Sequence, residues 1–169
     1  GIPNLLYAWS TPNGNIVAGQ SSWGAEVNAP GIYIVAVTDT TNNCMSFDTV
    51  VVSQDISLPT PLIATPDSIT CIVNSVVLDG SGSMGNNLSY LWSTLNGSIL
   101  SGANSSMATV SQAGTYSLLI TNQSNGCTAS ASIEVIQDAD IPLANAALPD
   151  TLNCLTTQIS LNGTGSTTG

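Results

Sequence analysis

Four cysteines are the most reactive side chains in this sequence: Cys44, Cys71, Cys127 and Cys154. Successive cysteines are 27, 56 and 27 positions apart, and the chain contains no histidine. Zinc sites use cysteine and histidine ligands at much closer spacing, so this pattern argues against zinc. Widely spaced cysteines in even number are typical of disulfides formed outside the cytosol. The cysteines therefore predict disulfide chemistry and an extracellular or cell-surface protein.

Few side chains of this sequence are suited to catalysis. There is no histidine, lysine or arginine, so neither a Ser-His-Asp triad nor a Ser-Lys dyad can be assembled. A pair of carboxylates remains, of the kind that glycosidases use. The recurring acids, such as Asp55, Asp67 and Asp138, lie beside linkers and loops rather than in a stretch that forms a pocket. We expect no catalytic residues and no enzyme activity.

Calcium is the one metal for which the sequence offers ligands. Extracellular modules bind calcium through carboxylate and carbonyl oxygens. Asp138 and Asp140, with the backbone carbonyls before Pro142, would supply part of such a site. No Asp-x-Asp-x-Asp loop is present, and the stretch 83 positions earlier has only Asp55 at the matching place. We expect no cofactor, with calcium at Asp138 and Asp140 as the weak alternative.

The charge balance and the apolar pattern exclude two classes of partner. Ten acidic residues and no basic ones give a net charge of −10, and only 6% of the residues are charged. Phosphate recognition needs a basic footprint, so nucleic acid is excluded. No run of about 18 apolar residues is present, so we expect no membrane insertion in this segment. The sequence does not begin with Met and shows no signal peptide, so any targeting segment is expected to lie outside it.

The sequence repeats itself with a period of 83 positions. Sliding it by 83 positions matches 30 of 86 residue pairs, with no insertion or deletion. The matches keep Trp9 in phase with Trp92 and Cys44 in phase with Cys127. One repeat is long enough for one small sandwich domain but not for two.

The local pattern is β throughout. Runs at 32–38 and 115–121 are rich in β-branched and aromatic residues, and Asn-Gly and Gly-Ser turn signals separate such runs. No stretch shows a sustained helical period of apolar residues. The sequence predicts an all-β chain of tandem antiparallel β-sandwich modules. The expected core residues are Trp9, Trp92, Tyr33 and Tyr116.

Several stretches of one full repeat resemble a known family. They are Ser75 to Ser83 (SVVLDGSGS), Tyr90-Leu91-Trp92, Ala113-Gly114-Thr115-Tyr116 and Asn125-Gly126-Cys127-Thr128-Ala129. The chain resembles the PKD-like and Ig-like tandem repeats of very large secreted Bacteroidetes surface adhesins, including those associated with gliding motility. It departs from the PKD pattern at 93–97, where a Gly-Asp-Gly element is expected. The resemblance implies Ig-like sandwiches in long surface fibres that hold cells to surfaces, to polysaccharide or to each other.

The repeat divides the chain into three parts. Residues 59–140 are expected to form one complete module. Residues 1–58 correspond to the C-terminal part of a module, strands C to G, and residues 141–169 to strands A and B of the next. Neither piece can bury its sheet face alone. Strands of the complete module are expected near 62–64, 68–73, 75–79, 88–94, 98–100, 108–111, from 114 onward, and 127–137.

Two assemblies are compatible with this division. Either the chain is part of a longer covalent repeat array, or separate subunits join by strand complementation. The sequence favours the first, because a repeat array gives these boundaries without a further assumption. Both predict that the chain's main partner is itself, head to tail in a filament.

The disulfide partners follow from the same division. Cys71 with Cys127 is the favoured pair, because closing a loop of about 56 residues would stabilise a module by about 4 kcal/mol. The alternative is a bridge between neighbouring modules, since a plain Ig topology puts these two positions at opposite ends. In both cases Cys44 and Cys154 are expected to pair with neighbouring units.

Resemblance to Bacteroidetes proteins also implies O-glycosylation at Asp-Ser/Thr-apolar sequences. Candidate acceptors are Thr40, Thr49, Ser68 and Thr151, the last of which follows Asp150. Ser68 and Thr151 occupy the same position of the repeat, which favours that pair over the others.

The combined pattern indicates a structural or adhesive shaft segment of an extracellular filament or giant surface adhesin. The alternative is a carbohydrate-binding module of a secreted hydrolase. Paired exposed aromatic residues would favour that alternative, but aromatic residues make up 5% of the chain and most fall at core positions. Trp23 is the exception, because Ser106 stands at its place in the other repeat. Glycans or surfaces are therefore expected only as further partners.

Overall fold

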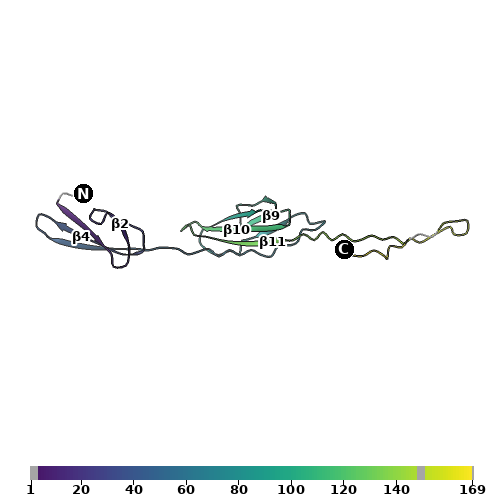
Figure 1. Ribbon diagram of the computed structural model, residues 1–169, viewed down its shortest axis with the longest axis horizontal. Helices are drawn as coiled ribbons and strands as arrows, with labels where there is room; N and C mark the ends of the chain where they lie inside the picture. The colour runs from purple at the N-terminus through teal and green to yellow at the C-terminus, as the bar shows by residue number, and fades with distance from the viewer. Residues whose placement is uncertain (1–3, 148–150, 169) are drawn as a thin grey trace. The chain divides into compact units, whose positions relative to one another are not determined.

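The computed structural model describes residues 4–147 and 151–168, so Asp150 lies outside the described residues. The chain forms two compact units, Gly1–Ser57 and Leu58–Gly169, called unit 1 and unit 2 below. All of the strands in the described residues pair in antiparallel fashion, so the protein is all-β (Figure 1). Within the same residues, no helix has the length and apolar character needed to cross a membrane.

Unit 2 contains a two-layer sandwich. One sheet has the strand order β11-β10-β7 and the other β6-β9-β8. This arrangement matches the Ig-like sandwich, in which strands B, E and D face strands C, F and G. The strands are β6 (Val76–Asp79), β7 (Leu88–Thr94), β8 (Ile99–Ser101), β9 (Met107–Val110), β10 (Gly114–Asn122) and β11 (Thr128–Val135).

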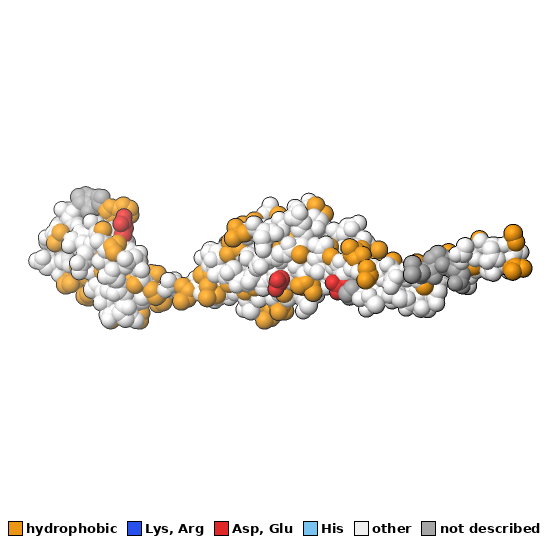
Figure 2. Space-filling model, turned by 45° about the vertical axis from the view of Figure 1, so that its right-hand side comes forward, with side chains coloured by type: hydrophobic (Ala, Val, Ile, Leu, Met, Phe, Trp, Pro, Cys, Tyr) orange, Lys and Arg blue, Asp and Glu red, His pale blue; other side chains and the backbone are white. Residues whose placement is uncertain are grey.

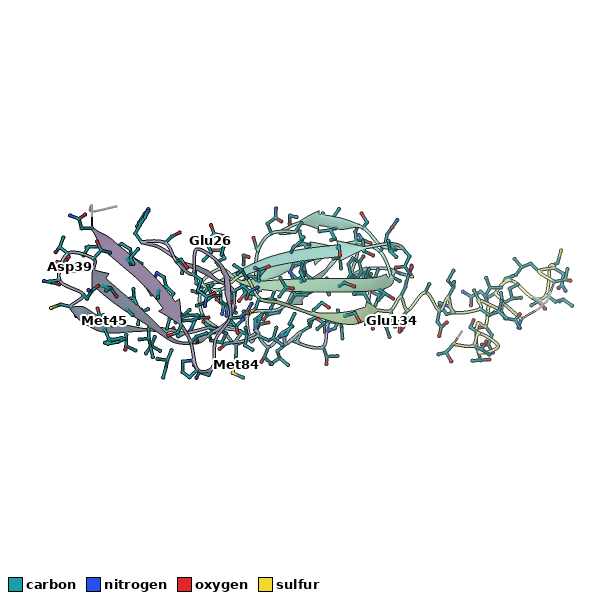
Figure 3. The ribbon with its side chains drawn as sticks, turned by 60° about the vertical axis from the view of Figure 1, so that its left-hand side comes forward. Glu26, Asp39, Met45, Met84 and Glu134 are labelled. Carbon is teal, nitrogen blue, oxygen red and sulfur yellow. The ribbon has the colours of Figure 1, made fainter. Side chains whose placement is uncertain are left out.

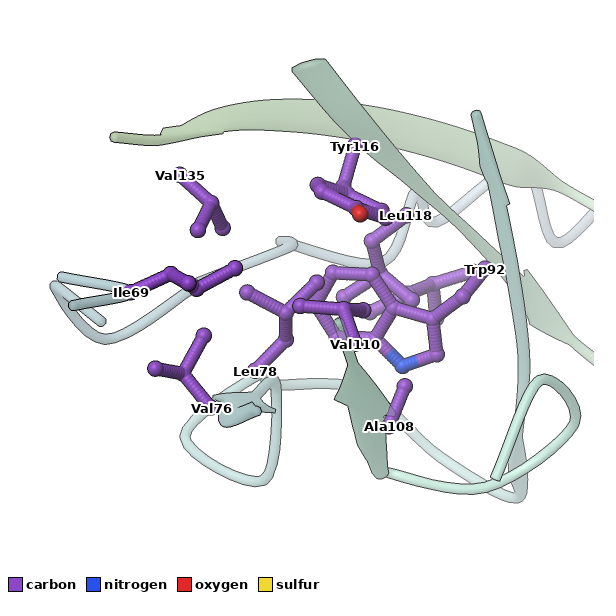
Figure 4. Close-up of a cluster of buried hydrophobic side chains, with 10 residues drawn as sticks. Ile69, Val76, Leu78, Trp92, Ala108, Val110, Tyr116, Leu118 and Val135 are labelled. Atoms are coloured by element: carbon purple, nitrogen blue, oxygen red, sulfur yellow. The ribbon is translucent and has the colours of Figure 1, made fainter. Parts of the chain in front are cut away.

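The two sheets enclose one apolar core. Side chains alternate across a strand, so every second residue of β10 points inward: Tyr116, Leu118 and Ile120 have no exposed surface. Figure 4 shows such side chains converging between the strands. The core consists of Ile69, Val76, Leu78, Trp92, Ala108, Val110, Tyr116, Leu118, Ile120 and Val135.

Unit 1 repeats part of this sandwich. One sheet has the order β1-β4-β5, and β2 pairs with β3 in a second. Strands β1, β4 and β5 lie one repeat before β7, β10 and β11. Strands β2 and β3 lie one repeat before β8 and β9. The register is also repeated, since Trp9 pairs with Val35 and Trp92 with Leu118. The strands are β1 (Leu5–Ser10), β2 (Ile16–Ala18), β3 (Glu26–Val27), β4 (Gly31–Asp39) and β5 (Met45–Val52).

The start of strand A differs from the sequence-based prediction. No strand forms at 62–64 or 68–73, where the one isolated bridge is that of Ile69 with Gln137, beside the end of β11. Pro61 and Pro66, which flank 62–64, have no backbone N–H to donate, and Thr70 turns the chain by donating its N–H to the carbonyl of Val73 at 3.0 Å. The covering segment of the module is therefore an extended, irregular chain that leads into β6.

A buried tyrosine ties the two sheets of unit 2 together. The Tyr116 hydroxyl donates to the carbonyl of Gln112 at 2.7 Å and accepts from the N–H of Ser98 at 2.9 Å. Its ring lies against Gly97, where any Cβ would collide with the hydroxyl. Tyr33 makes the same pair of bonds in unit 1. This arrangement is the tyrosine corner of Ig-like sandwiches.

Replacing this tyrosine tests how much the corner contributes. Tyr116→Phe leaves one backbone donor and one acceptor without their partner, so we expect unit 2 to lose about 1–3 kcal/mol of unfolding free energy. Chemical denaturation followed by tryptophan fluorescence measures this loss. Tyr90→Phe is the matched control, because its ring packs only at the margin of the core, where it is half-buried. Equal stability of the two variants would contradict the role of the corner.

The surface carries charges of one sign. Figure 2 shows the acidic side chains as small separate patches. With ten acidic residues and no Lys, Arg or His, side-chain ion pairs cannot stabilise either unit. Salt therefore screens only repulsion between carboxylates.

Salt dependence of stability tests this property. Raising NaCl from about 20 to about 300 mM shortens the screening length well below the size of a module. We expect the melting temperature to stay constant or to rise slightly. Differential scanning calorimetry measures it, and a melting temperature that falls with salt would contradict net repulsion between the carboxylates.

Candidate functional site

Unit 1 leaves part of an apolar face uncovered. In unit 2, Leu118 and Ile120 have no exposed surface, but their counterparts Val35 and Val37 are only half-buried. Tyr33, 1% exposed, is the core residue that unit 1 buries fully. The other half-buried core positions of unit 1 are Trp9, Ala25, Val27 and Val52.

The core positions of unit 1 are only half-buried because its described residues include no counterpart of the segments that cover the core of unit 2. There, β6 pairs with β9, and Ile69 donates its N–H to the carbonyl of Ile136 at 3.0 Å, beside the end of β11. Val76 and Leu78 point from β6 into the core and are 5% and 0% exposed. Among the described residues of unit 1, no strand pairs with β3 on its outer side. The half-buried face is the consequence.

The matching segment occurs at the other end of the chain. Residues 143–167, of which 148–150 are not described, form what we call the C-terminal ribbon. Its Ala147 N–H donates to the carbonyl of Asn162 at 2.8 Å, and Ala64 and Asp79, one repeat earlier, make the same bond at 2.8 Å. The bridge between the two ends of the ribbon and its turn also recur. The ribbon thus has the local backbone structure of the segment that covers unit 2.

The ribbon nevertheless has no core to cover. Leu152 and Leu161 are 57% and 75% exposed, whereas their counterparts Ile69 and Leu78 are 5% and 0% exposed. Ile159, the third equivalent position, is half-buried. In the described residues, unit 1 therefore has an apolar face with no covering segment, and the C-terminal ribbon has the structure of a covering segment with no apolar face beneath it.

Sequence reasoning missed one property of this ribbon. Its turn is held by Asn153, whose side-chain oxygen accepts from the N–H groups of Leu155 and Thr156 at 2.8 and 2.9 Å. The Thr70 hydroxyl does the same at the equivalent place in unit 2. Asn and Thr are residues that form such local turns, and this was the available signal.

The positions of the cysteines correct the predicted disulfide. All four cysteines are free thiols. Cys71 lies just beyond Ile69, at the end of β11, whereas Cys127 directly precedes the start of β11. Eight residues of strand separate these ends, which is about 27 Å, and a disulfide requires Cα atoms within about 7 Å. The predicted Cys71–Cys127 bridge within one module is therefore wrong.

The two ends of unit 2 can be followed in Figure 3, where Met84 lies toward one end and Glu134 toward the other. In unit 1, Asp39 and Met45 mark the end that carries the turn with Cys44. Cys44 and Cys154 are exposed. Their pairing with cysteines of neighbouring units stays a prediction.

Two of the carboxylates stabilise turns. Hydrogen bonds from the hydroxyl and the N–H of Thr41 lower the pKa of the Asp39 carboxyl below its ordinary value. Asn122 stands at the same position of unit 2, and its side-chain oxygen accepts the equivalent bond from Ser124 at 3.0 Å. An amide therefore replaces the carboxylate in this role, which makes Asp39 a turn residue rather than a catalytic acid.

The same comparison applies to Asp79. Hydrogen bonds from Ser81 lower the pKa of its carboxyl. In the ribbon, Asn162 accepts the equivalent bond from Thr164 at 2.9 Å. Neither carboxylate depends on its charge for its structural role.

Asp138 and Asp140 are both exposed, and Asp140 donates its N–H to the Asp138 carboxylate at 3.3 Å. With Pro142 and Thr168 they line a surface hollow of about 390 Å³. Calcium takes about six to eight oxygen ligands. In the described part of the chain, no group of three or more His, Cys, Asp or Glu residues gathers. Two carboxylates alone supply a minor share of a calcium shell.

The candidate acceptors for O-glycans differ in exposure. Thr40, Thr49 and Thr151 are exposed, and Ser68 is half-buried. The Thr40 hydroxyl donates to the carbonyl of Asn4 at 3.1 Å. Exposed hydroxyls are accessible to a transferase, and glycosylation at these positions stays a prediction.

The tryptophans occupy three different environments. Trp92 is 2% exposed, Trp9 is half-buried and Trp23 is 75% exposed. Trp9 keeps its indole hydrogen bond to the carbonyl of Ser22 at 3.1 Å, as Trp92 does to Ser105 at 3.0 Å. Its orientation is therefore set within unit 1, and its remaining exposure comes from the missing cover.

Comparison with known proteins adds little detail. No family model and no curated protein matches the chain. A solved structure of the three N-terminal domains of the bacteriophage RB49 Highly Immunogenic Outer Capsid protein (Hoc) is similar, with 17% identity and a TM-score of 0.41. That match covers 86% of this chain and 52% of the other, so the chain spans about half of that structure's length.

Domains 4 and 5 of the S-layer protein SbsC are also similar, with 15% identity and a TM-score of 0.29. The match covers 79% of this chain and 71% of the other. Likeness at this level carries no argument about function. The fold assignment rests on the chain's own strands, registers and core.

Peptide mapping tests the corrected disulfide assignment. A protease that cleaves after Asp and Glu is required, because the chain has no Lys or Arg. Cleavage after Asp67, Asp79 and Glu134 places Cys71 in peptide 68–79 and Cys127 in peptide 80–134. In chains that run at the monomer mass without reductant, we expect no linked 68–79/80–134 pair in mass spectrometry. Finding that pair in the monomer would restore the bridge within one module.

Proposed function

We propose that this chain is a structural shaft segment of an extracellular filament or very large surface adhesin, built head to tail from β-sandwich repeats. One observation supports this above the others. The strands of unit 1 recur one repeat later in unit 2 with the same pairing register. Repetition of one unit along a chain builds length, because each repeat contacts only its neighbours.

The path of the chain through unit 2 supports a mechanical role. The chain enters beside Met84, where Thr60 pairs with it, and leaves beyond β11 at the other end. Tension would therefore act along β10 and β11, which pair in antiparallel fashion over eight residue pairs. A pull along the strands loads all of these hydrogen bonds together, so the module resists extension.

The composition supports an extracellular location. Without Lys or Arg, trypsin-like proteases find no cleavage site in the chain. Solubility depends on uncharged polar residues, since only 6% of the residues are charged. The resemblance to PKD-like and Ig-like repeats of Bacteroidetes adhesins is part of this proposal, together with O-glycans at Ser68, Thr151, Thr40 and Thr49. So are disulfides that join Cys44 and Cys154 to neighbouring units.

Electron microscopy of the native assembly tests the proposal. We expect unbranched filaments with a regular axial spacing of modules, because head-to-tail contacts that do not close give open fibres. Antibodies raised against unit 2 should label the filaments along their whole length. Discrete particles, or label confined to one point, would overturn the shaft assignment.

The alternative, a carbohydrate-binding module, is favoured by a single observation, the 75% exposure of Trp23. Exposed aromatic rings stack on sugars and on protein partners alike. A glycan array discriminates between the two functions. The shaft assignment predicts no binding, whereas selective binding that Trp23→Ala abolishes would support the alternative.

A further inference from the structure

We propose that the outer face of the β1-β4-β5 sheet of unit 1 binds the same face of a second copy of this chain. This face lies on the opposite side of the sheet from the half-buried core of unit 1. The contact adds a self-association site to the proposed shaft function, and neither depends on the other.

The strand registers identify the residues of this face. On β4, Tyr33 is buried in the core, so the residues on either side of it along the strand point outward. The pairing of β4 with β1 and β5 places the outward residues of all three strands side by side. The polar ones are Ser10, Thr38 and Thr49. The apolar ones, which we call the outer patch, are Leu6, Ala8, Ile32, Ile34, Ala36, Met45, Phe47 and Val51.

Unit 2 has the same sheet without this patch. At the equivalent positions it carries Ser89, Leu91, Thr115, Ser117, Leu119, Thr128, Ser130 and Glu134. Antiparallel sheets with one face on a core usually keep polar residues on the other face, and unit 2 follows this rule. Because the same strands fold in unit 2 with polar residues there, folding does not require the outer patch. Its apolar side chains therefore point to a binding function.

The exposed area of the patch is large enough for a stable contact between two copies. Its five most exposed large side chains are Leu6 (62%), Ile32 (37%), Met45 (58%), Phe47 (65%) and Val51 (70%). A large apolar residue exposes on the order of 200 Å² when free of neighbours, so these five expose about 600 Å². Two copies would bury about 1,200 Å² between them, which exceeds the roughly 1,000 Å² that a stable interface requires.

Charge favours a second copy at this face. Two chains of net charge −10 repel each other wherever their acidic residues meet. The outer patch contains no acidic residue, and Asp48 on β5 lies opposite Val35, so its carboxylate points to the other side of the sheet. In unit 2, Glu134 stands at the position of Val51, so the same face of that unit would bring carboxylates together. The sheet of unit 1 thus allows face-to-face contact between copies, and that of unit 2 opposes it.

The shape of the patch is self-complementary. Ala8 lies opposite Ala36, and Ala36 lies opposite Phe47 on the neighbouring strand. With strands about 4.8 Å apart, the two alanines form a low strip beside the phenylalanine ring. In a two-fold contact, the ring of each copy lies on the alanine strip of the other, as side chains interdigitate between packed sheets. Such an isologous contact uses the same patch twice and closes on two copies.

Substitutions taken from the repeat itself provide the first test. Sedimentation equilibrium of the 169-residue chain over a concentration series is expected to show a reversible species of twice 17.2 kDa. Phe47→Ser combined with Val51→Glu installs the residues that unit 2 carries at these positions, so the sheet should keep its fold. We expect the dissociation constant to rise about a hundredfold or more, because the contact loses two aromatic anchors and gains facing carboxylates.

Ile56→Glu combined with Leu58→Ser is the matched control. These residues are 67% and 68% exposed, lie outside the three strands, and undergo the same change of charge and polarity. This variant should associate as the unmodified chain does. An unmodified chain that stays monomeric at all concentrations would overturn the inference. Association that Phe47→Ser with Val51→Glu leaves unchanged would overturn it as well.

Methionine oxidation locates the contact without any substitution. Met45 belongs to the outer patch, whereas Met84 and Met107 of unit 2 lie elsewhere, and the three are 58%, 68% and 49% exposed. Chains with alkylated thiols are treated with hydrogen peroxide below and above the association concentration, and peptide mass spectrometry follows each methionine. We expect association to slow the oxidation of Met45 severalfold and to leave the other two rates unchanged. Equal protection of all three, or protection of Met84 or Met107 alone, would contradict the assignment to this face.

Binding to octyl-agarose separates a second copy from an apolar surface as the occupant. A chain that is monomeric in solution, but is retained on octyl-agarose unless Phe47→Ser and Val51→Glu are present, would overturn the second copy and assign the patch to apolar surfaces. The shaft function is tested separately by the micrographs of the native assembly. Absence of the two-fold contact would leave filaments intact, and absence of filaments would leave the two-fold contact intact.

Discussion

A β-sandwich core is complete only when both of its sheets are covered, and this constraint explains most of the chain's structure. Covering the core of unit 2 takes three apolar side chains from the segment that includes Ile69 and β6. Full burial of one such side chain contributes about 1.5–3 kcal/mol. Unit 1 has the same strands and registers without this contribution, and its core positions other than Tyr33 stay half-buried. Unit 2 thus shows the fold with its covering segment, and unit 1 shows the same strands without it.

Unit 1 keeps its geometry because local hydrogen bonds fix it. The Tyr33 hydroxyl bonds to the carbonyl of Ala29 at 2.6 Å, and the Thr11 hydroxyl bonds to the carbonyl of Ile32 at 2.7 Å. The Trp9 indole holds the loop before β3 in the same way. These bonds recur in unit 2 between the equivalent partners of the next repeat. They depend on dipoles rather than on ion pairs, which suits a chain that has no cationic side chain.

The sequence predicted the parts of the fold that repeat locally, and it failed where a feature depends on distant segments. The strand predicted at 88–94 forms as Leu88–Thr94, because alternating apolar residues and flanking turns define it locally. The stretch 68–73 was wrongly predicted as a strand, because its apolar pattern hides the turn that Thr70 makes with Ile72 and Val73. Trp9, predicted as a core residue, is only half-buried, and the division of the repeat already implied this by leaving residues 1–58 without strands A and B.

The disulfide prediction failed for a related reason. The 56 positions between Cys71 and Cys127 favoured a stabilising loop, but the Ig topology that argued against this pair was the better guide, because the two residues lie at opposite ends of β11. Topology decides this, and topology follows from strand order. The same topology means that any disulfide of these two thiols joins different modules, which would make covalent continuity a property of the assembly.

An uncovered sheet edge is ordinarily a risk for aggregation, so its specificity requires a physical explanation. The outer strand of unit 1, β3, is two residues long, and Glu26 is one of them. Short edge strands and charged side chains discourage indiscriminate pairing. In unit 2 the equivalent edge is covered by β6, where Val76 and Leu78 point into the core and Val77 lies between them opposite Thr109. Because side chains alternate along a strand, a slip of β6 by one residue would turn Val76 and Leu78 away from the core. Register, rather than charge complementarity, therefore specifies how a covering segment fits a module whose charges are of a single sign.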